Sequence, residues 1–435
     1  MKVCKFGGTS MANAECIKRV AEIVSSDDAV SCVVVSAPGK RAKNDTKVTD
    51  LLYACLDKVN DGLSPQEAFN PIEERFDSIL KGLNLNCDFK TYYDEIKSEL
   101  AKGATKDYIA SRGEFLSAVV LSEYLNWQFI DAKDFVRFDD KGNFLSEETN
   151  AYAKAVLHGV KKAIIPGFYG ATGDGTIKTF SRGGSDISGS IVARADIYEN
   201  WTDVDGFMKC DPRIVENPEV MELITYKELR ELSYMGANVL HPDSIFPVRK
   251  NDIPIHIRNT FNPQAKGTMI VSFSGAYERK ESTVTGIAGK KHFIAINIEK
   301  SMMNNELGFA RKVLEVIEKN GLGIEHMPSG IDTLSVVIDG SNHDEDALER
   351  IVEGIKKVCQ PDTIDVERNL ALIAVVGHGM SRKKGTAQKV CNSLYEADVN
   401  IRMIDQGSSE LNIIIGVENK DYEKAISALY KEFLS

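Results

Sequence analysis

The C-terminal third of this 435-residue chain contains an internal repeat. Residues 294–340 match residues 371–417 at a constant offset of 77 without gaps, for example at Met303 and Met380 and at Gly308 and Gly385. Self-similarity on this scale indicates a duplicated structural unit. Each copy has the order strand, helix, strand, strand, helix, which is typical of a ferredoxin-like α+β unit. The repeat therefore predicts two similar small units after a larger N-terminal region.

The two copies differ in completeness. The second copy ends in a helix near 421–434 without a closing strand, whereas the strand 283–288 before the first copy has no assigned place. Placing that strand in the second unit removes an unpaired edge. We therefore expect the first unit at 290–367 to be inserted into a second unit formed by 281–289 and 368–435. The first unit should contain strands at 293–298, 323–327, 333–339 and 363–366 and helices at 307–320 and 344–357.

Residues 1–265 have the pattern of an α/β domain, and 266–280 that of a linker. Strand candidates at 31–35, 163–168 and 253–258 alternate with helical segments, and 64–126 is expected to be helical. The β-branched run at 31–35 is typical of a parallel strand buried on both faces. These features predict a sheet between two layers of helices.

Composition excludes several function classes. The net charge is −11 and there is no long basic run, which argues against duplex nucleic acid as a partner. The longest apolar runs have the length of strands rather than of membrane spans, and an apolar leader is missing. Eight cysteines without C-x-x-C spacing indicate reduced thiols. We therefore expect a cytoplasmic protein.

The segment Lys5–Ser10, Lys-Phe-Gly-Gly-Thr-Ser, lies between a predicted short strand at 3–4 and a helical stretch at 12–24. Its glycines let backbone amides approach phosphate oxygens, and a helix start favours negative charge. Lys5 can supply a positive charge to a transferred phosphoryl group. The lysine precedes the glycines, so this is not the nucleotide loop that ends in Gly-Lys-Ser/Thr. An ordinary strand–turn–helix with a stray lysine is the alternative.

Two further segments combine charge with a suitable setting. Arg182–Asp186 holds a planar cation, two glycines and a carboxylate within five residues. A glycine turn with a structural ion pair would have the same sequence. Glu114 precedes an apolar helical stretch, where an acid either faces a cleft or lies on the helix surface.

Six segments in the same order together resemble the aspartokinase family, in its monofunctional form with a C-terminal pair of ACT domains. The resemblance covers essentially the whole chain and implies an amino-acid-kinase-like three-layer α/β/α domain plus two ferredoxin-like ACT units. The segments are 5–10, 35–37, 111–117, 181–186, 202–206 with 211–213, and 236–242.

The resemblance implies that ATP and Mg²⁺ serve to phosphorylate the side chain of L-aspartate. The nucleophile is already a carboxylate, so alignment and charge neutralisation suffice without a general base. Two alternatives stay open at this point. One is another kinase of the same fold, acting on glutamate, acetylglutamate or uridylate, and the other is a non-catalytic amino-acid sensor.

The resemblance also assigns residues. Arg182 would hold the aspartate carboxylate, Asp186 would orient Lys5, and Glu114 would meet the amino group. Further substrate contacts would be Ser36, Thr49, Gly183, Gly184 and Ser185. ATP contacts besides Lys5 would be Gly7, Gly8, Thr9, Thr202, Asp203, Met208, Arg213, Asn238 and Val239. Asn238 and Met208 depart from the family, where lysine and tyrosine are common, and no protein metal ligand is expected.

A regulatory amino acid, lysine or threonine, is expected to bind the first ACT unit. Loop amides near Gly308 can receive a carboxylate, and Glu325 or Asp332 can receive an ammonium group. The second unit has Arg402 and Ser409 at the matching positions, which suggests that it mainly assembles the protein into a homo-oligomer. The predicted effector residues are Met303, Gly308, Phe309, Ala310, Ile324, Glu325 and Asp332.

Overall fold

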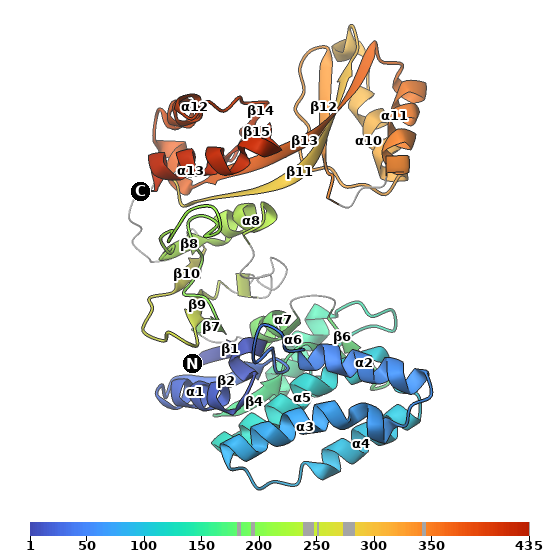
Figure 1. The fold of residues 1–435 in the computed structure, drawn as a ribbon, viewed down its shortest axis with the longest axis vertical. Coiled ribbons are helices and arrows are strands. Elements are labelled where there is room, and N and C mark those ends of the chain that lie inside the picture. The colour runs from blue at the N-terminus through green and yellow to red at the C-terminus, as the bar shows by residue number, and fades with distance from the viewer. Residues whose placement is uncertain are drawn as a thin grey trace. The chain divides into compact units, whose positions relative to one another are not determined.

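The computed structural model describes residues 1–180, 184–192, 196–237, 248–249, 252–272, 283–341 and 345–434. The chain divides into two compact units (Figure 1). The first unit comprises Met1–Phe207, Val220–Leu229 and Asn238–Glu278, and the second comprises Met208–Glu219, Arg230–Ala237 and Arg279–Ser435.

An eight-stranded mixed sheet forms the centre of the first unit, in the order β3-β4-β2-β1-β7-β9-β10-β8. All its pairs are parallel except β9 with β10. The strands are β1 (Lys2–Phe6), β2 (Val30–Val35), β3 (Gln128–Phe129), β4 (Ala163–Pro166), β7 (Ile197–Thr202), β8 (Leu223–Thr225), β9 (Ile255–Asn259) and β10 (Thr268–Val271). A separate hairpin joins β5 (Tyr169–Ala171) to β6 (Ile177–Thr179).

Helices cover this sheet because alternate strand residues point to opposite faces. Cys4 and Phe6 of β1 join one large apolar core with five helices, whereas α7 packs against β1, β2 and β7 and carries Asp186 to the Lys5 face. The fold class predicted for this unit, a layered α/β domain, is confirmed. The five helices are α1 (Ala14–Ser25), α2 (Val48–Asn60), α3 (Pro65–Leu83), α4 (Lys90–Ala101) and α5 (Lys106–Leu125), and the others are α6 (Ser146–Val156) and α7 (Gly184–Val192). Helix α8 (Tyr226–Tyr234) begins in the first unit, and its residues from Arg230 on belong to the second.

The second unit is built on a five-stranded antiparallel sheet, in the order β12-β11-β13-β15-β14. Its two longest strands, β11 (Gly286–Glu299) and β13 (Thr363–Val376), pair along their whole length and run through both halves of the sheet (Figure 1). The other strands are β12 (Thr333–Asp339), β14 (Met403–Asp405) and β15 (Asn412–Glu418). The helices are α10 (Phe309–Lys319), α11 (Glu345–Cys359), α12 (Thr386–Glu396) and α13 (Tyr422–Phe433).

Each half of this sheet has its own apolar core. Ile296 and Ile351 belong to the core that contains α10 and α11, and Ile373 and Ile426 belong to the core that contains α12 and α13. The early half of β11 lies in the second core, and Gly286–Lys290 pair with Val376–Leu372. The residue bounds predicted for the two ACT units themselves stay a prediction.

Three local expectations differ from the structure. Segment 323–327 is not a regular strand but makes an isolated bridge at His326, because Gly323 weakens strand pairing and Pro328, which directly follows the segment, lacks an amide hydrogen. The predicted linker at 266–280 contains β10, which pairs with β8 and β9. The helix expected from residue 12 begins at Ala14, after a 3₁₀ turn, η1 (Gly8–Met11).

Candidate active site

Neighbouring parallel strands end at one edge of the first unit's sheet, where ligands bind in open α/β folds. Backbone hydrogen bonds connect the loops that follow these strands. Gly7 N donates to Trp201 O at 3.1 Å, Ser36 N to Phe6 O at 3.1 Å, and Gly167 N to Val35 O at 2.9 Å. The ends of β1, β2, β4 and β7 are therefore held together, and they carry several of the predicted site residues.

The loop after β1 packs directly against the loop after β2. Gly39 N donates to Gly8 O at 2.7 Å. An ideal Cβ on Gly39 would lie 2.7 Å from Gly8 C and 2.9 Å from Thr9 N. Since real Cβ atoms do not come this close to backbone atoms, only glycine allows this approach. Gly39 therefore fixes the position of the predicted phosphate loop, although the amino-acid sequence alone did not indicate this role.

Lys5 is held above this loop by a carboxylate from another element. Its Nζ lies 2.5 Å from Asp186 Oδ1, and both side chains are largely buried. An ideal Cβ on Gly7 would lie 3.9 Å from Lys5 Nζ. Asn200 Nδ2 donates to the same Asp186 oxygen at 2.9 Å. The structure therefore brings Lys5, Gly7 and Asp186 together as expected, and it adds Asn200, which the sequence interpretation missed.

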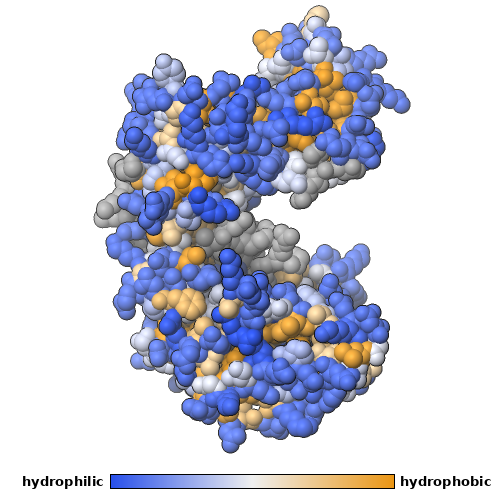
Figure 2. Space-filling model, in the orientation of Figure 1, coloured by the Kyte–Doolittle hydropathy of each residue, from blue (hydrophilic) through white to orange (hydrophobic). Residues whose placement is uncertain are grey.

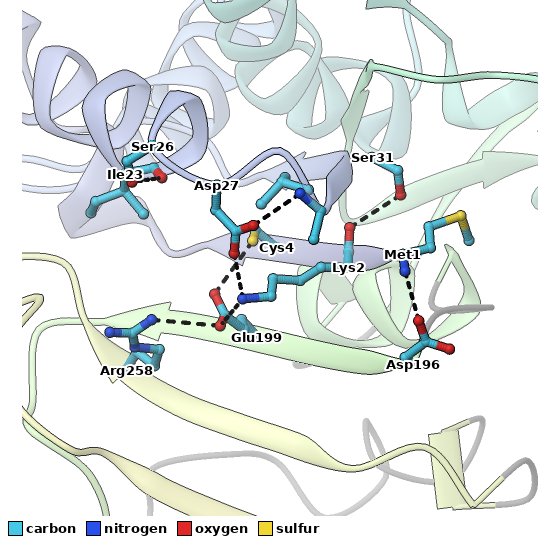
Figure 3. Close-up of polar contacts among 12 residues, drawn as sticks. Met1, Lys2, Cys4, Ile23, Ser26, Asp27, Ser31, Asp196, Glu199 and Arg258 are labelled. Carbon is cyan, nitrogen blue, oxygen red and sulfur yellow. Dashed lines mark hydrogen bonds and ion pairs between the residues drawn. The ribbon is translucent and has the colours of Figure 1, made fainter.

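The opposite face of β1 and β7 carries a second charged cluster (Figure 3). The buried Glu199 accepts from Lys2 Nζ at 2.9 Å and from Trp201 Nε1 at 2.9 Å. Arg258 Nη1 lies 3.5 Å from Glu199, and its guanidinium lies over the Trp201 ring at 4.4 Å. A buried carboxylate is costly unless it is paired, and the partners of Glu199 on β7 come from Lys2 of β1 and Arg258 of β9. The network therefore connects these three strands. It supports the strands that carry Lys5 and Asn200.

Glu114 of α5 is 5% exposed, and its Oε2 has no hydrogen-bond partner among the described residues. Burial raises the pKa of Glu114 to about 8, while a backbone hydrogen bond with Ala37 and the charges of Arg112 and Lys5 act in the opposite direction. Gly113 packs against the Ala37 side chain, so α5 touches the loop after β2. An unpartnered buried carboxylate oxygen beside this loop is suited to receive an ammonium group.

Other predicted contacts lie near the same strand ends. Val48 N donates to Pro38 O at 3.0 Å, which places Thr49 in the first turn of α2 beside the loop that contains Ser36. Ser185 lies against Gly167, where an added Cβ would approach its side chain to 2.8 Å. Gly184 opens α7.

The nucleotide side is only partly described. Thr202 ends β7, and its hydroxyl donates to Asp203 Oδ1 at 3.2 Å. Met208 and Arg213 belong to the second unit, where Arg213 is engaged by Asp211 through contacts of 2.6–3.1 Å. Arg182, Gly183, Asn238 and Val239 lie outside the described residues.

Comparisons with known proteins give the family. Residues 1–259 match the model of the amino acid kinase family, and 373–433 match an ACT domain model. Aspartokinase 3 of Bacillus subtilis (strain 168) is 38% identical over 458 aligned residues, which cover 100% of this chain and 99% of that protein. The chain belongs to the aspartokinases.

Solved aspartokinase structures agree with this placement. The crystal structure of Clostridium acetobutylicum aspartate kinase has 48% identity and a TM-score of 0.94, with all of both chains covered. E. coli aspartokinase III in complex with aspartate and ADP has 26% identity and a TM-score of 0.75, again over both whole chains. The predicted enzyme class, an ATP-dependent aspartate kinase with an ACT regulatory region, is confirmed.

Two features are absent from the described part of this aspartokinase. None of its described helices combines the length and apolar character that a membrane crossing needs. Within the same residues, histidine, cysteine, aspartate and glutamate side chains form no group of three or more that could hold a metal ion.

The predicted effector residues all lie in the second unit. Met303 opens a 3₁₀ turn, η4 (Met303–Asn305). Gly308, at φ +76°, precedes α10, which begins with the buried Phe309 and the partly buried Ala310. Glu325 N donates to Val337 O at 2.9 Å, while Asp332 is exposed. Burial and a hydrogen bond to Glu325 raise the pKa of Tyr234 to about 12, so the Tyr234 hydroxyl engages this acid.

The loop before α10 also contains a charged group that the sequence interpretation missed. Glu306 accepts from Lys300 at 2.5 Å and from Lys312 at 2.6 Å, and these hydrogen bonds lower the pKa of Glu306. In the second half of the sheet, Arg402 pairs with Glu367 at 2.5 Å. The two halves therefore differ in charge at matching positions, as the sequence suggested.

We predict that Gly39→Ala lowers kcat about 10–100-fold, because the added methyl group displaces the phosphate loop from its aligned position. Gly173→Ala is the matched control, since an added Cβ there meets nothing within 4 Å. Steady-state kinetics of both purified variants test this. A Gly39→Ala protein with the kcat of the control would contradict the assignment of Gly39.

The raised pKa of Glu114 predicts a pH dependence of aspartate use. Below about pH 8 the free site holds a neutral acid, which binds an ammonium group poorly, so kcat/KM for aspartate should rise about tenfold per pH unit up to that value. Glu114→Gln should have a low value without this rise. The exposed Glu123 on the same helix gives a control, Glu123→Gln. An unchanged rise in Glu114→Gln would remove Glu114 from the substrate site.

Proposed function

We propose that this aspartokinase transfers the γ-phosphoryl group of ATP to the side-chain carboxylate of L-aspartate, which gives 4-phospho-L-aspartate and ADP. The observation that carries the proposal is a pair of ionisable side chains beside the loops that follow β1 and β2. Lys5 offers a cation above the glycine loop, and Glu114 offers a buried carboxylate oxygen without a partner among the described residues. One suits phosphate, and the other suits the amino group of an amino acid.

The reaction follows from this arrangement. An oxygen of the aspartate side chain attacks the γ-phosphorus, and the bond to the β–γ bridging oxygen breaks, so that ADP leaves with that electron pair. Lys5 and the amides of Gly7, Gly8 and Thr9 would neutralise charge on the transferred group. Arg182, with the backbone of Gly183 to Ser185, would hold the second carboxylate of aspartate. No proton has to be removed from the nucleophile.

Mg²⁺ enters this proposal as part of the substrate, bound to the phosphates of ATP. Such an ion keeps several water ligands and needs few protein carboxylates. Bound ion would supply charge neutralisation between the β- and γ-phosphates. Asp203, which directly follows β7, is the carboxylate among the described residues of the predicted nucleotide contacts.

We predict that Lys5→Ala retains its fold and loses about 10²–10³-fold in kcat, the usual effect of removing a charge that stabilises the transition state. Lys18→Ala, at a more exposed lysine on α1, is the control. The measurement is ADP release with aspartate as acceptor, compared with glutamate, acetylglutamate and uridylate. Near-normal turnover of Lys5→Ala would refute its role, and a preference for another acceptor would refute the proposed substrate.

Regulation by lysine or threonine, with lysine preferred, is the second part of the proposal. E. coli aspartokinase III, at 25% identity and a TM-score of 0.74, has been solved in complex with lysine and aspartate. Positive φ at Gly308 and the start of α10 provide loop amides for a carboxylate, and Glu325 and Asp332 are candidate acceptors for an ammonium group. An effector must bind the less active state better than the active one.

Association into a homo-oligomer through the ACT region is the third part. The surface in Figure 2 is mainly hydrophilic, with separate apolar areas. Several large apolar side chains of the loops in the first half of the ACT region are exposed, which favours contact with another subunit. They are Met302 at 67%, Leu307 at 96%, Met327 at 39% and Ile331 at 71%.

Titration of the full-length enzyme with lysine and with threonine tests the regulatory proposal. We expect one of them to inhibit at millimolar levels, with a coupling of about 1–3 kcal/mol, and we expect Glu325→Ala or Asp332→Ala to weaken that inhibition. Glu349→Ala, on the exposed side of α11, is the control. If neither amino acid binds or inhibits, the ACT region has a purely assembling role.

A further inference from the structure

Asn200 occupies an unusual position for an amide side chain. It is 4% exposed on β7, a central strand, and it points to the face of the sheet that α7 covers. A buried amide is unfavourable unless it is hydrogen-bonded. Its Nδ2 donates to Asp186 Oδ1 at 2.9 Å, the oxygen that also lies 2.5 Å from Lys5 Nζ.

Strand register creates this three-residue group. Lys5 of β1 and Asn200 of β7 are direct neighbours in the parallel pairing, so their side chains emerge side by side on one face. Asp186 comes from the first turn of α7 and meets both. If residue 200 had no hydrogen-bond donor, Lys5 would be the only described residue whose side chain holds Asp186 Oδ1.

We propose that Asn200 is a positioning residue for phosphoryl transfer. It holds the Asp186 carboxylate in place, and it stays bonded to that carboxylate when the Lys5 ammonium turns toward the transferred phosphoryl group. The reason is the cost of an unpaired, largely buried carboxylate, which would otherwise hold Lys5 back. This inference rests on the proposed aspartate phosphorylation and adds a residue to it.

The first test is Asn200→Leu, which keeps the approximate volume and removes the amide. We expect kcat to fall about 10–100-fold, the usual effect of losing a hydrogen bond to a charged group, with KM for aspartate and ATP nearly unchanged. Tyr198→Phe is the matched control. Tyr198 lies on the same face of the same strand, and its buried hydroxyl has no hydrogen-bond partner among the described residues.

A double-mutant cycle separates positioning from packing. Turnover is measured with radiolabelled ATP for Asn200→Leu alone, for Asp186→Ala alone and for the double variant. If Asn200 acts through Asp186, Asn200→Leu should cause little further loss once Asp186 is removed. The same fold-loss in both backgrounds would overturn the proposal, and so would a wild-type kcat in folded Asn200→Leu.

Asn200→Ala covers the case in which the leucine variant fails to fold, because its smaller side chain fits the same space and also lacks the donor. It should also show a fall in kcat at an unchanged KM, and a wild-type kcat would overturn the proposal. The wild-type enzyme separates this inference from the proposed function. If the wild type shows no aspartate-dependent ADP release, the proposed function fails. If the wild type is active and the Asn200 variants have the same kcat, only the role proposed for Asn200 is refuted.

Discussion

The parallel pairing of β1 with β7 is the constraint on which the rest of the site depends. It sets Lys5 beside Asn200 on one face of the sheet and Cys4 beside Glu199 on the other. A shift by one residue would turn every side chain of β1 to the opposite face. Lys5 would then point into the apolar core below α1–α5, away from Asp186. The position of the cation therefore follows from the sheet rather than from the glycine loop after β1.

The charges on the two faces of these strands play different parts. Glu199 is surrounded by Lys2, Arg258 and the Trp201 indole, so its bonds are satisfied inside the protein. Beside the loop that follows β2, Glu114 of α5 keeps an oxygen without a partner among the described residues, and on the α7 side of β1 Lys5 has a single described carboxylate partner. Satisfied groups hold strands together, and incompletely satisfied groups are available to a substrate. This difference separates the structural network from the candidate site.

Local patterns in the sequence predicted much of the fold. The Lys5–Ser10 segment, the buried run at 31–35 and the gapless repeat each gave a correct element type, since their periodicity and glycine positions are local properties. The irregular segment 323–327 and β10 were misjudged, because proline, glycine and pairing with distant strands decided them. Family resemblance supplied roles for Glu114 and Asp186, and the structure supplied their surroundings.

Long-range contacts could not be predicted in this way. Asn200 lies beside Lys5 only because β7 pairs with β1, whose residues are almost two hundred positions earlier in the chain. Gly39 is needed because two loops approach within hydrogen-bond distance at Gly8. Each of these residues looks ordinary in the sequence. The signal that could have indicated Asn200 is an asparagine in the middle of a strand-like segment, Ile197–Thr202, where a buried amide needs a hydrogen-bond partner.

The most direct test of this account is a crystal structure of the full-length enzyme with aspartate and MgADP–aluminium fluoride, which imitates the transferred phosphoryl group. The account predicts Lys5 Nζ within hydrogen-bond distance of the fluoride group, about 3 Å, with Asp186 still bonded to Asn200 and with the aspartate ammonium on Glu114. A structure in which Lys5 stays on Asp186 away from the fluoride, and the ammonium lies elsewhere, would contradict it.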